Sequence, residues 1–309
     1  MRLPGLSLPV FVPVLVLVLA FALAGAPSPA SGAAGGAATA ANPLDVLVTI
    51  LPHASLVERL GGGTVRVHVL VGRNQSPETY QPSPRELQAM AGARVWFTTG
   101  TPVETALRSR LMAMMPGLEI VPTHRDLDAL ADHHCGHHDH DHDHGELDPH
   151  VWVSPRNTAR QAAVMAAALQ RWLPAESARI DATLAALQDE LAALDRDLTQ
   201  LLEPVRGGTF FVFHPAFGYF ARDYGLRQEA VESGGMAPSP RRLTELLRTI
   251  EAQGATAIYV QPQQSIEALR PLAREAALQV IVLDPLDRDH LANLRRIGEA
   301  LAAELKERP

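Results

Sequence analysis

Cysteine is almost absent from this chain of 309 residues: Cys135 is the one that it has. An intramolecular disulfide is therefore impossible, and the fold must depend on its hydrophobic core even in an oxidising compartment. No cysteine directly follows the apolar stretch near the N-terminus, which argues against a lipoprotein. Hydrophobic residues make up 47% of the chain, enough for two modest domains with cores of their own.

Positive charge is also scarce. Lys and Arg together number 27 against 34 Asp and Glu, which gives a formal net charge of −7 at pH 7. Proteins that bind nucleic acids carry clustered basic surface, so this balance argues against a nucleic-acid partner.

A second long apolar run is missing as well. The only one, Val10–Leu23, follows a start whose single charge is Arg2, and small residues come after it. A basic start, a short apolar core and a small-residue region are typical of a secretory signal peptide. Because this core is shorter than the ~20 residues of a bilayer span, we expect export with cleavage and no stable membrane anchor. Residues 1–41 are predicted to hold the signal peptide and a small-residue N-terminal segment.

From Asp45 onward, short β-branched runs alternate with stretches of helical periodicity. Strands that alternate with helices predict parallel sheets covered on both faces. Two such series flank one long helical stretch. The predicted fold class is therefore α/β, with two similar lobes, each a parallel-sheet βα domain, joined by one long helix and separated by a cleft. The predicted domains are residues 42–174 for the N-terminal lobe with a His-rich loop at 132–146, 175–204 for the linking helix, and 205–309 for the C-terminal lobe.

The same periodicities locate the individual elements. Strands are expected at Val46–Ile50, Val65–Leu70, Arg94–Thr99, Leu118–Val121, Thr209–Phe213, Leu226–Val231, Thr256–Gln261 and Gln279–Leu283. Helices are expected at Ser55–Leu60, Pro84–Ala91, Val103–Met115, Pro155–Leu173, Ala175–Leu202, Arg241–Gln253, Ile266–Ala277 and His290–Lys306.

Histidine is what the chain has in abundance, and it is concentrated in one short tract. Neutral imidazole is the commonest protein ligand for borderline metals, and a short His-rich tract usually indicates metal binding. The tract alone is ambiguous, because a disordered loop can bind metal loosely. We expect it to be an auxiliary, weak metal-binding loop. Its histidines are His133, His134, His137, His138, His140, His142 and His144.

Other candidate ligands recur just after predicted strands. Ligands of open α/β sheets bind beyond the carboxyl ends of the strands, where the loops gather. We therefore expect the side chains in these positions to share a metal site in the cleft. The predicted ligands are His53, Glu78, His150, His214 and Asp284.

Each of these five residues also has a plainer interpretation. His214 would serve as a hydrogen-bonded core histidine, and Asp284 would cap the turn that Asp-Pro favours. His150 would belong to a simple turn, Glu78 would be an exposed carboxylate, and His53 would merely start a helix after a proline. The placement of all five at the binding edge of their own lobe favours the metal site.

The donor types favour zinc. Two or three imidazoles with one or two carboxylates suit tetrahedral Zn²⁺. Manganese accepts the same groups but prefers more oxygen ligands and binds more weakly, so Mn²⁺ is the alternative cargo. A zinc metalloenzyme needs a nearby general base and an open metal position, and no H-E-x-x-H pair is present, so we expect no enzymatic activity. A zinc buffer or chaperone is a further alternative.

With these residues in view, nearly the whole mature chain resembles the periplasmic zinc-binding proteins of ATP-binding-cassette (ABC) metal importers, a family that also contains manganese-binding members. Several linked motifs in the same order carry the resemblance. They are LGGGTV at 60–65, SPETYQPSP at 76–84, DPHVWVSP at 148–155, HPAFGYFA at 214–221 and LDPL at 283–286.

The resemblance implies metal ligands at His150, His214 and Asp284. The family's first ligand is usually a histidine, and Glu78 stands at that position here. Either Glu78 binds the metal itself or His53 restores a third imidazole. The resemblance also implies two lobes bridged by one long helix, a His-rich loop that collects or senses zinc, and a periplasmic monomer that delivers Zn²⁺ to an ABC permease with its ATPase.

Overall fold

The computed structural model describes residues 42–125, 127–128, 130, 148–232, 239–264 and 266–308. The predicted signal peptide at 1–41, the histidines from His133 to His144, and Cys135 lie outside the described residues. Within the described ranges, no helix combines the length and the apolar character that a membrane span requires.

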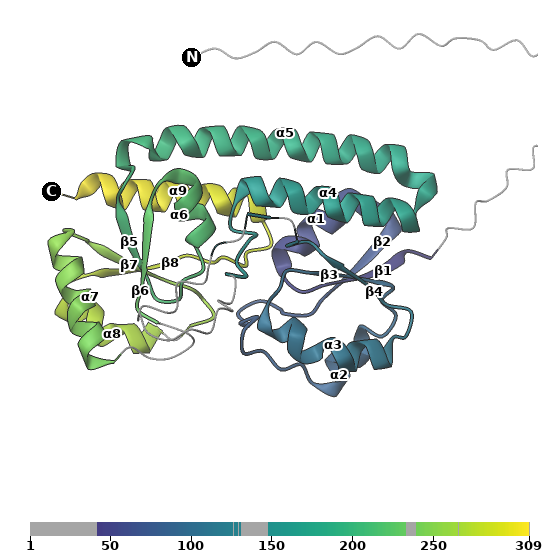
Figure 1. The fold of residues 1–309 in the computed structure, drawn as a ribbon, viewed down its shortest axis with the longest axis horizontal. Coiled ribbons are helices and arrows are strands. Elements are labelled where there is room, and N and C mark those ends of the chain that lie inside the picture. The colour runs from purple at the N-terminus through teal and green to yellow at the C-terminus, as the bar shows by residue number, and fades with distance from the viewer. Residues whose placement is uncertain are drawn as a thin grey trace, which may run out of the picture. The chain divides into compact units, whose positions relative to one another are not determined.

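The N-terminal lobe is a four-stranded parallel sheet with helices on both faces (Figure 1). Its strand order is β2-β1-β3-β4. Alternate residues of β1 enter different cores: Val46 and Val48 pack towards α1, α4 and α5, whereas Leu47 packs towards α2 and α3. The elements are β1 (Leu44–Val48), α1 (Leu51–Gly61), β2 (Val65–Val69), α2 (Pro84–Ala89), β3 (Val95–Thr98), α3 (Pro102–Met114), β4 (Glu119–Pro122) and α4 (Pro155–Trp172).

The C-terminal lobe repeats this plan. Its sheet is also parallel and has the order β6-β5-β7-β8. Phe210 and Val212 of β5 face the core formed with α5, α6 and α9, and Phe211 faces α7 and α8 on the other side. The elements are α5 (Ser177–Leu202), β5 (Thr209–Val212), α6 (Gly218–Tyr224), β6 (Arg227–Ala230), α7 (Pro240–Ala252), β7 (Ala257–Val260), α8 (Ile266–Glu275), β8 (Gln279–Val282) and α9 (His290–Glu307).

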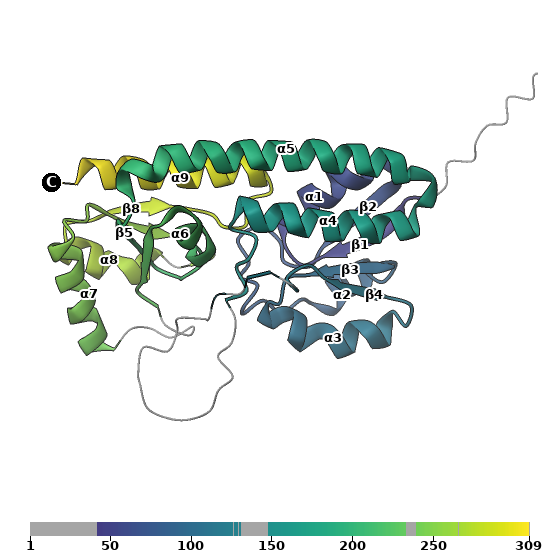
Figure 2. The same ribbon diagram turned by 45° about the horizontal axis from the view of Figure 1, so that its top comes forward.

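Helix α5 is shared by the two cores. Leu187 and Leu191, in its first part, pack with the N-terminal lobe, and Leu198 and Leu202, in its last turns, pack with the C-terminal lobe. Both views show α5 running beside α4 and α9 (Figures 1 and 2), the two helices that it contacts most. The apolar residues of α5 recur every three or four positions, as a helix with one buried face requires. The predicted α/β fold with two parallel-sheet lobes and one long helix is confirmed.

Short 3-10 turns lie at both ends of α5, at Pro174–Glu176 and Glu203–Val205, and a third, Gly62–Thr64, follows α1. We keep the division of the mature chain into 42–174, 175–204 and 205–309 as a proposal.

One local prediction was wrong, and one helix was missed. Helix α1 begins at Leu51 rather than Ser55, because Pro52 is suited to a first helical turn and starts the helix early. Helix α6 was not predicted, since its 7 residues are too few to show a clear period; Gly225, in the left-handed region with φ 68°, ends it. The early start of α1 moves His53 from a loop into a helix.

Candidate metal centre

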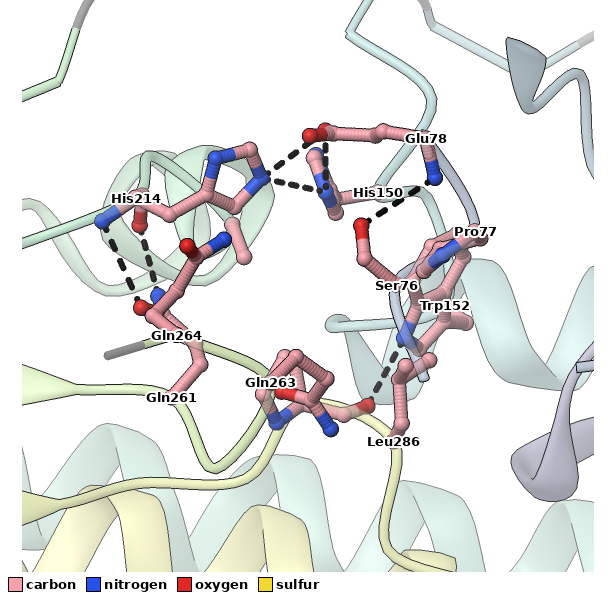
Figure 3. A pocket seen from close by; sticks show the side chains of 12 residues that line it. Ser76, Pro77, Glu78, His150, Trp152, His214, Gln261, Gln263, Gln264 and Leu286 are labelled. Carbon is pink, nitrogen blue, oxygen red and sulfur yellow. Dashed lines mark hydrogen bonds and ion pairs between the residues drawn. The ribbon is translucent and has the colours of Figure 1, made fainter. Parts of the chain in front are cut away.

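Three of the predicted ligands converge on one point. Glu78 comes from the loop after β2, His150 from the segment before α4, and His214 from the loop after β5 (Figure 3). The Glu78 Oε1 atom lies 2.9 Å from His214 Nε2 and 3.7 Å from His150 Nε2, and the two Nε2 atoms are 3.3 Å apart. Among the residues that the structure describes, this is the one group of His, Cys, Asp or Glu side chains close enough to share a metal ion.

The Glu78 loop is held by its own backbone contacts. The Glu78 amide donates to Ser76 Oγ at 3.2 Å, and the Tyr80 amide donates to the Ser76 carbonyl at 2.9 Å. The Val103 amide, in the first turn of α3, donates to the Pro77 carbonyl at 3.1 Å. The loop is therefore fixed to α3, and the carboxylate is presented towards the C-terminal lobe.

His150 is oriented by Asp148. One oxygen of Asp148, Oδ1, accepts from the His150 amide at 2.9 Å and contacts His150 Nδ1 at 2.7 Å. Nδ1 is thereby the protonated nitrogen, which leaves Nε2 as a metal donor facing Glu78 and His214. Burial alone would raise the pKa of Asp148, but the neighbouring His150 imidazole holds it below its ordinary value.

His214 is fixed through its backbone and lies between two carboxylates. The Gln261 side chain donates to the His214 carbonyl at 2.6 Å and accepts from its amide at 3.3 Å. Glu232 Oε2 lies 3.5 Å from His214 Nδ1, on the opposite side of the ring from Glu78. Burial would lower the pKa of His214, but the two carboxylates outweigh it and raise the pKa to about 9. Without metal, the two carboxylates favour a positive charge at the site, and a proton on His214 supplies it.

The three donors open into a small cavity between the lobes. Its volume, about 20 Å³, is on the scale of a single water molecule or ion. Trp152 forms one wall, and its Nε1 donates to the Pro285 carbonyl at 2.8 Å, which joins the lobes beside the site. The lining residues are Ser76, Pro77, Glu78, His150, Trp152, His214, Ala216, Gln261, Gln263, Gln264, Pro285 and Leu286.

Asp284, another predicted ligand, lies outside this group. Its Oδ1 accepts from the Leu286 amide at 2.9 Å and from Gln263 Nε2 at 3.0 Å. That is the turn-capping arrangement that Asp-Pro sequences favour. Its neighbours Gln263, Pro285 and Leu286 line the cavity, so the carboxylate is close behind the wall.

His53, the fifth predicted ligand, is also separate from the three. It is fully buried in the first turn of α1. Burial and the nearby His290 lower the pKa of His53 to about 3. Burial likewise lowers the pKa of His290 to about 4. These two histidines therefore stay neutral inside the fold.

This pair predicts acid sensitivity of the metal-free protein. Both folded pKa values lie below the unfolded value of about 6.5. Below that pH the unfolded chain binds protons that the folded protein does not, so the free energy of unfolding is greatest above pH 6.5 and decreases as the pH falls towards about 4. Each group steepens the fall by up to about 1.4 kcal/mol per pH unit. Denaturant unfolding at several pH values should show that the free energy of unfolding falls less steeply with decreasing pH in His53→Gln than in the unaltered protein. An equal slope in the two proteins would refute this assignment.

Two residues of the site were not predicted from the sequence. Glu232 follows β6 closely, just as His214 follows β5, so the strand-edge rule used for the five candidates would have selected it. Asp148 precedes His150 by two positions, the spacing at which an Asp side chain bonds a backbone amide.

Comparisons with known proteins identify the family of the chain. The sequence model of the family described as "Zinc-uptake complex component A periplasmic" matches residues 46–303. A crystal structure of ZnuA is similar with a TM-score of 0.78 and 32% sequence identity, over 85% of this chain and 100% of that chain. A zinc-bound ZnuA deletion mutant has a TM-score of 0.79 at 32% identity, over 87% and 100%.

A curated relative is more distant. The zinc-binding lipoprotein AdcA of Streptococcus pneumoniae serotype 4 is 27% identical over 266 residues, which cover 80% of this chain and 51% of AdcA. The chain therefore spans about half the length of that relative.

Proposed function

The chain belongs to the family of the periplasmic component A of the zinc-uptake complex, and from that premise we propose that it captures Zn²⁺ and delivers it to an ABC-type import permease. The family consists of solute-binding transport proteins and not of enzymes. The observation that supports the capture site best is the meeting of Glu78, His150 and His214, from both lobes, at an ion-sized cavity.

In this proposal the two imidazole Nε2 atoms and a Glu78 carboxylate oxygen bind the ion. Three such donors are the ligand types that Zn²⁺ takes in proteins. The fourth position is for Asp284, after its carboxylate turns from Gln263, or for a water molecule. His53 has no part in it, because it is buried apart from the three donors.

Zinc and protons compete at this site. Metal-ligating imidazoles must be deprotonated, so zinc binding releases the proton that Glu232 and Glu78 favour on His214. Zinc affinity is therefore expected to rise with pH until His214 deprotonates. The buried position of His150 and His214, 4% and 6% exposed, then shields the bound ion from water.

The partners and the location follow the family. The protein acts outside the cytoplasm. We propose a cleaved signal peptide, a monomer in the periplasm, and docking of the loaded protein on a permease served by its ATPase. Helix α5 packs into both cores, which supports small lobe motions rather than a wide hinge.

We further propose that the histidines at 133–144 collect zinc weakly beside the tight site. The mature protein should then hold one tightly bound zinc and additional, weakly bound zinc, measured by calorimetric titration and metal analysis after dialysis. Deleting residues 133–144 should abolish the weak class and keep the tight one. Loss of the tight site in the deletion protein would contradict this division of roles.

A further inference from the structure

Helix α6 of the C-terminal lobe makes several polar contacts with the segment on either side of residues 131–147. Arg222 Nη1 donates to the Asp128 carbonyl at 2.8 Å. Ser154 Oγ, at the N-cap of α4, donates to Asp223 Oδ2 at 2.5 Å. A helix of one lobe thus contacts the other lobe on both sides of residues 131–147, close to the start of α4.

The hydroxyl of Tyr219 lies at the centre of these contacts. It accepts from the Leu130 amide at 3.1 Å and donates to the Asp148 carbonyl at 3.0 Å. The Asp148 amide also donates to the Leu130 carbonyl at 3.0 Å. Residues 130 and 148 are therefore joined twice, once directly and once through Tyr219. The Tyr219 side chain is fully buried, and the Arg222 guanidinium lies 5.0 Å from its ring centroid.

Asp148 connects this junction to the candidate metal centre. Its backbone is held by Tyr219, and its carboxylate orients His150. Gly218, the residue before Tyr219, also lies against that carboxylate: a Cβ at Gly218 would come within 2.8 Å of Asp148 Oδ2. The position of Asp148 is therefore defined by α6 from two directions. His214 lies only a few residues before α6, so the same helix helps to position both imidazoles.

We propose that Tyr219 is a positioning residue for metal binding, which fixes the Asp148 backbone so that His150 Nε2 points at His214 and Glu78. The inference deepens the proposed zinc function and rests on it. Removing the hydroxyl leaves the backbone of Asp148 held through its amide alone, so its carboxylate no longer selects one orientation of the His150 ring. Removing a group that orients a metal-ligating histidine lowers metal affinity roughly 10- to 100-fold.

The test is the zinc affinity of Tyr219→Phe, compared with Tyr224→Phe. Tyr224 lies on the same helix and is also buried, but its hydroxyl donates to Asp195 Oδ1 at 3.1 Å. Tyr219→Phe should raise the zinc dissociation constant roughly tenfold, whereas Tyr224→Phe should leave it unchanged. Both variants are measured by competition with a chromophoric chelator, in protein lacking residues 133–144. Equal affinities for Tyr219→Phe and the unaltered protein would overturn the proposal.

Two further measurements separate positioning from a general loss of structure. Nitrogen NMR shifts of His150 should report a single ring orientation, with Nδ1 bonded to Asp148, in the unaltered protein and a mixture in Tyr219→Phe. In a double-mutant cycle, Tyr219→Phe should cost little affinity once Asp148→Ala is present, because the two act on the same ring. Additive losses would overturn the proposal. If His214→Ala also left the affinity unchanged, the proposed zinc site itself would fail, which distinguishes the two outcomes.

Discussion

Replacing His214 by alanine is expected to lower the affinity of the cleft for zinc more than a hundredfold. His214 Nε2 is the atom nearest to both other donors, 2.9 Å from Glu78 Oε1 and 3.3 Å from His150 Nε2. Its removal leaves two donors, Glu78 and His150, which both come from the N-terminal lobe. Loss of an orienting group alone costs roughly 10- to 100-fold, and loss of a ligand removes a metal–nitrogen bond as well.

His68→Ala is a matched control for that substitution. His68 lies on β2, where its Nε2 contacts Asp45 Oδ1 at 2.8 Å, away from the cavity. Its removal should leave zinc affinity unchanged. Both variants are compared by chelator competition in protein without residues 133–144, so that loop-bound zinc does not conceal the loss. Retention of tight binding by His214→Ala would remove His214 from the proposed site.

The fold was predictable because the two periodicities are strong. The inner strands of both sheets are short, largely apolar runs buried on both faces, such as Phe210–Val212 of β5, and they come before helices of amphipathic pattern. The cap of α2 was predictable too: Ser83 accepts from the Glu86 amide, and the Glu86 carboxylate accepts from the Ser83 amide. Such signals are local, so one sequence is enough to show them.

The site was predictable only for residues that follow the carboxyl ends of strands. That rule brought forward Glu78, His150 and His214, which the structure gathers into one group. It also brought forward His53 and Asp284, which lie outside that group. A shift of four residues in the start of a helix decides whether His53 is in a loop or in the core, and spacing alone does not reveal that shift. Likewise, no sequence pattern reveals whether the carboxylate of Asp284 caps a turn or faces a cavity.

The long-range contacts that orient the donors were beyond sequence reasoning for a different reason. Tyr219 and Asp148 meet across a separation of 71 residues, and Gln261 reaches His214 across 47. Pairing at that distance is set by the docking of the two lobes, which a single sequence does not specify. The orienting residues of such a site therefore come from the structure, whereas the ligands themselves can be proposed from motifs.

Glu78 is expected to control the choice between zinc and manganese. In the family that the sequence resembles, this position is usually a histidine. Glu78 therefore offers an oxygen donor where a histidine would offer a nitrogen donor. Carboxylates suit manganese, whereas imidazole favours zinc. Glu78→His should therefore raise the ratio of zinc affinity to manganese affinity at least tenfold. The ratio is measured by competitive titration of the two ions in protein lacking residues 133–144.

The charge of Glu78 gives the same substitution a second, independent consequence. Glu78 is one of the two carboxylates that raise the pKa of His214, so a neutral imidazole in its place should lower that pKa. The proton then competes less strongly, and zinc binding by Glu78→His should persist to lower pH than in the unaltered protein. Glu78→Gln removes the charge but keeps an oxygen donor, so it should shift the pH dependence in the same direction without the same gain in zinc preference. If Glu78→His and Glu78→Gln changed the metal ratio equally, charge rather than donor type would control selectivity, and the assignment of Glu78 as a ligand that selects the metal would be wrong.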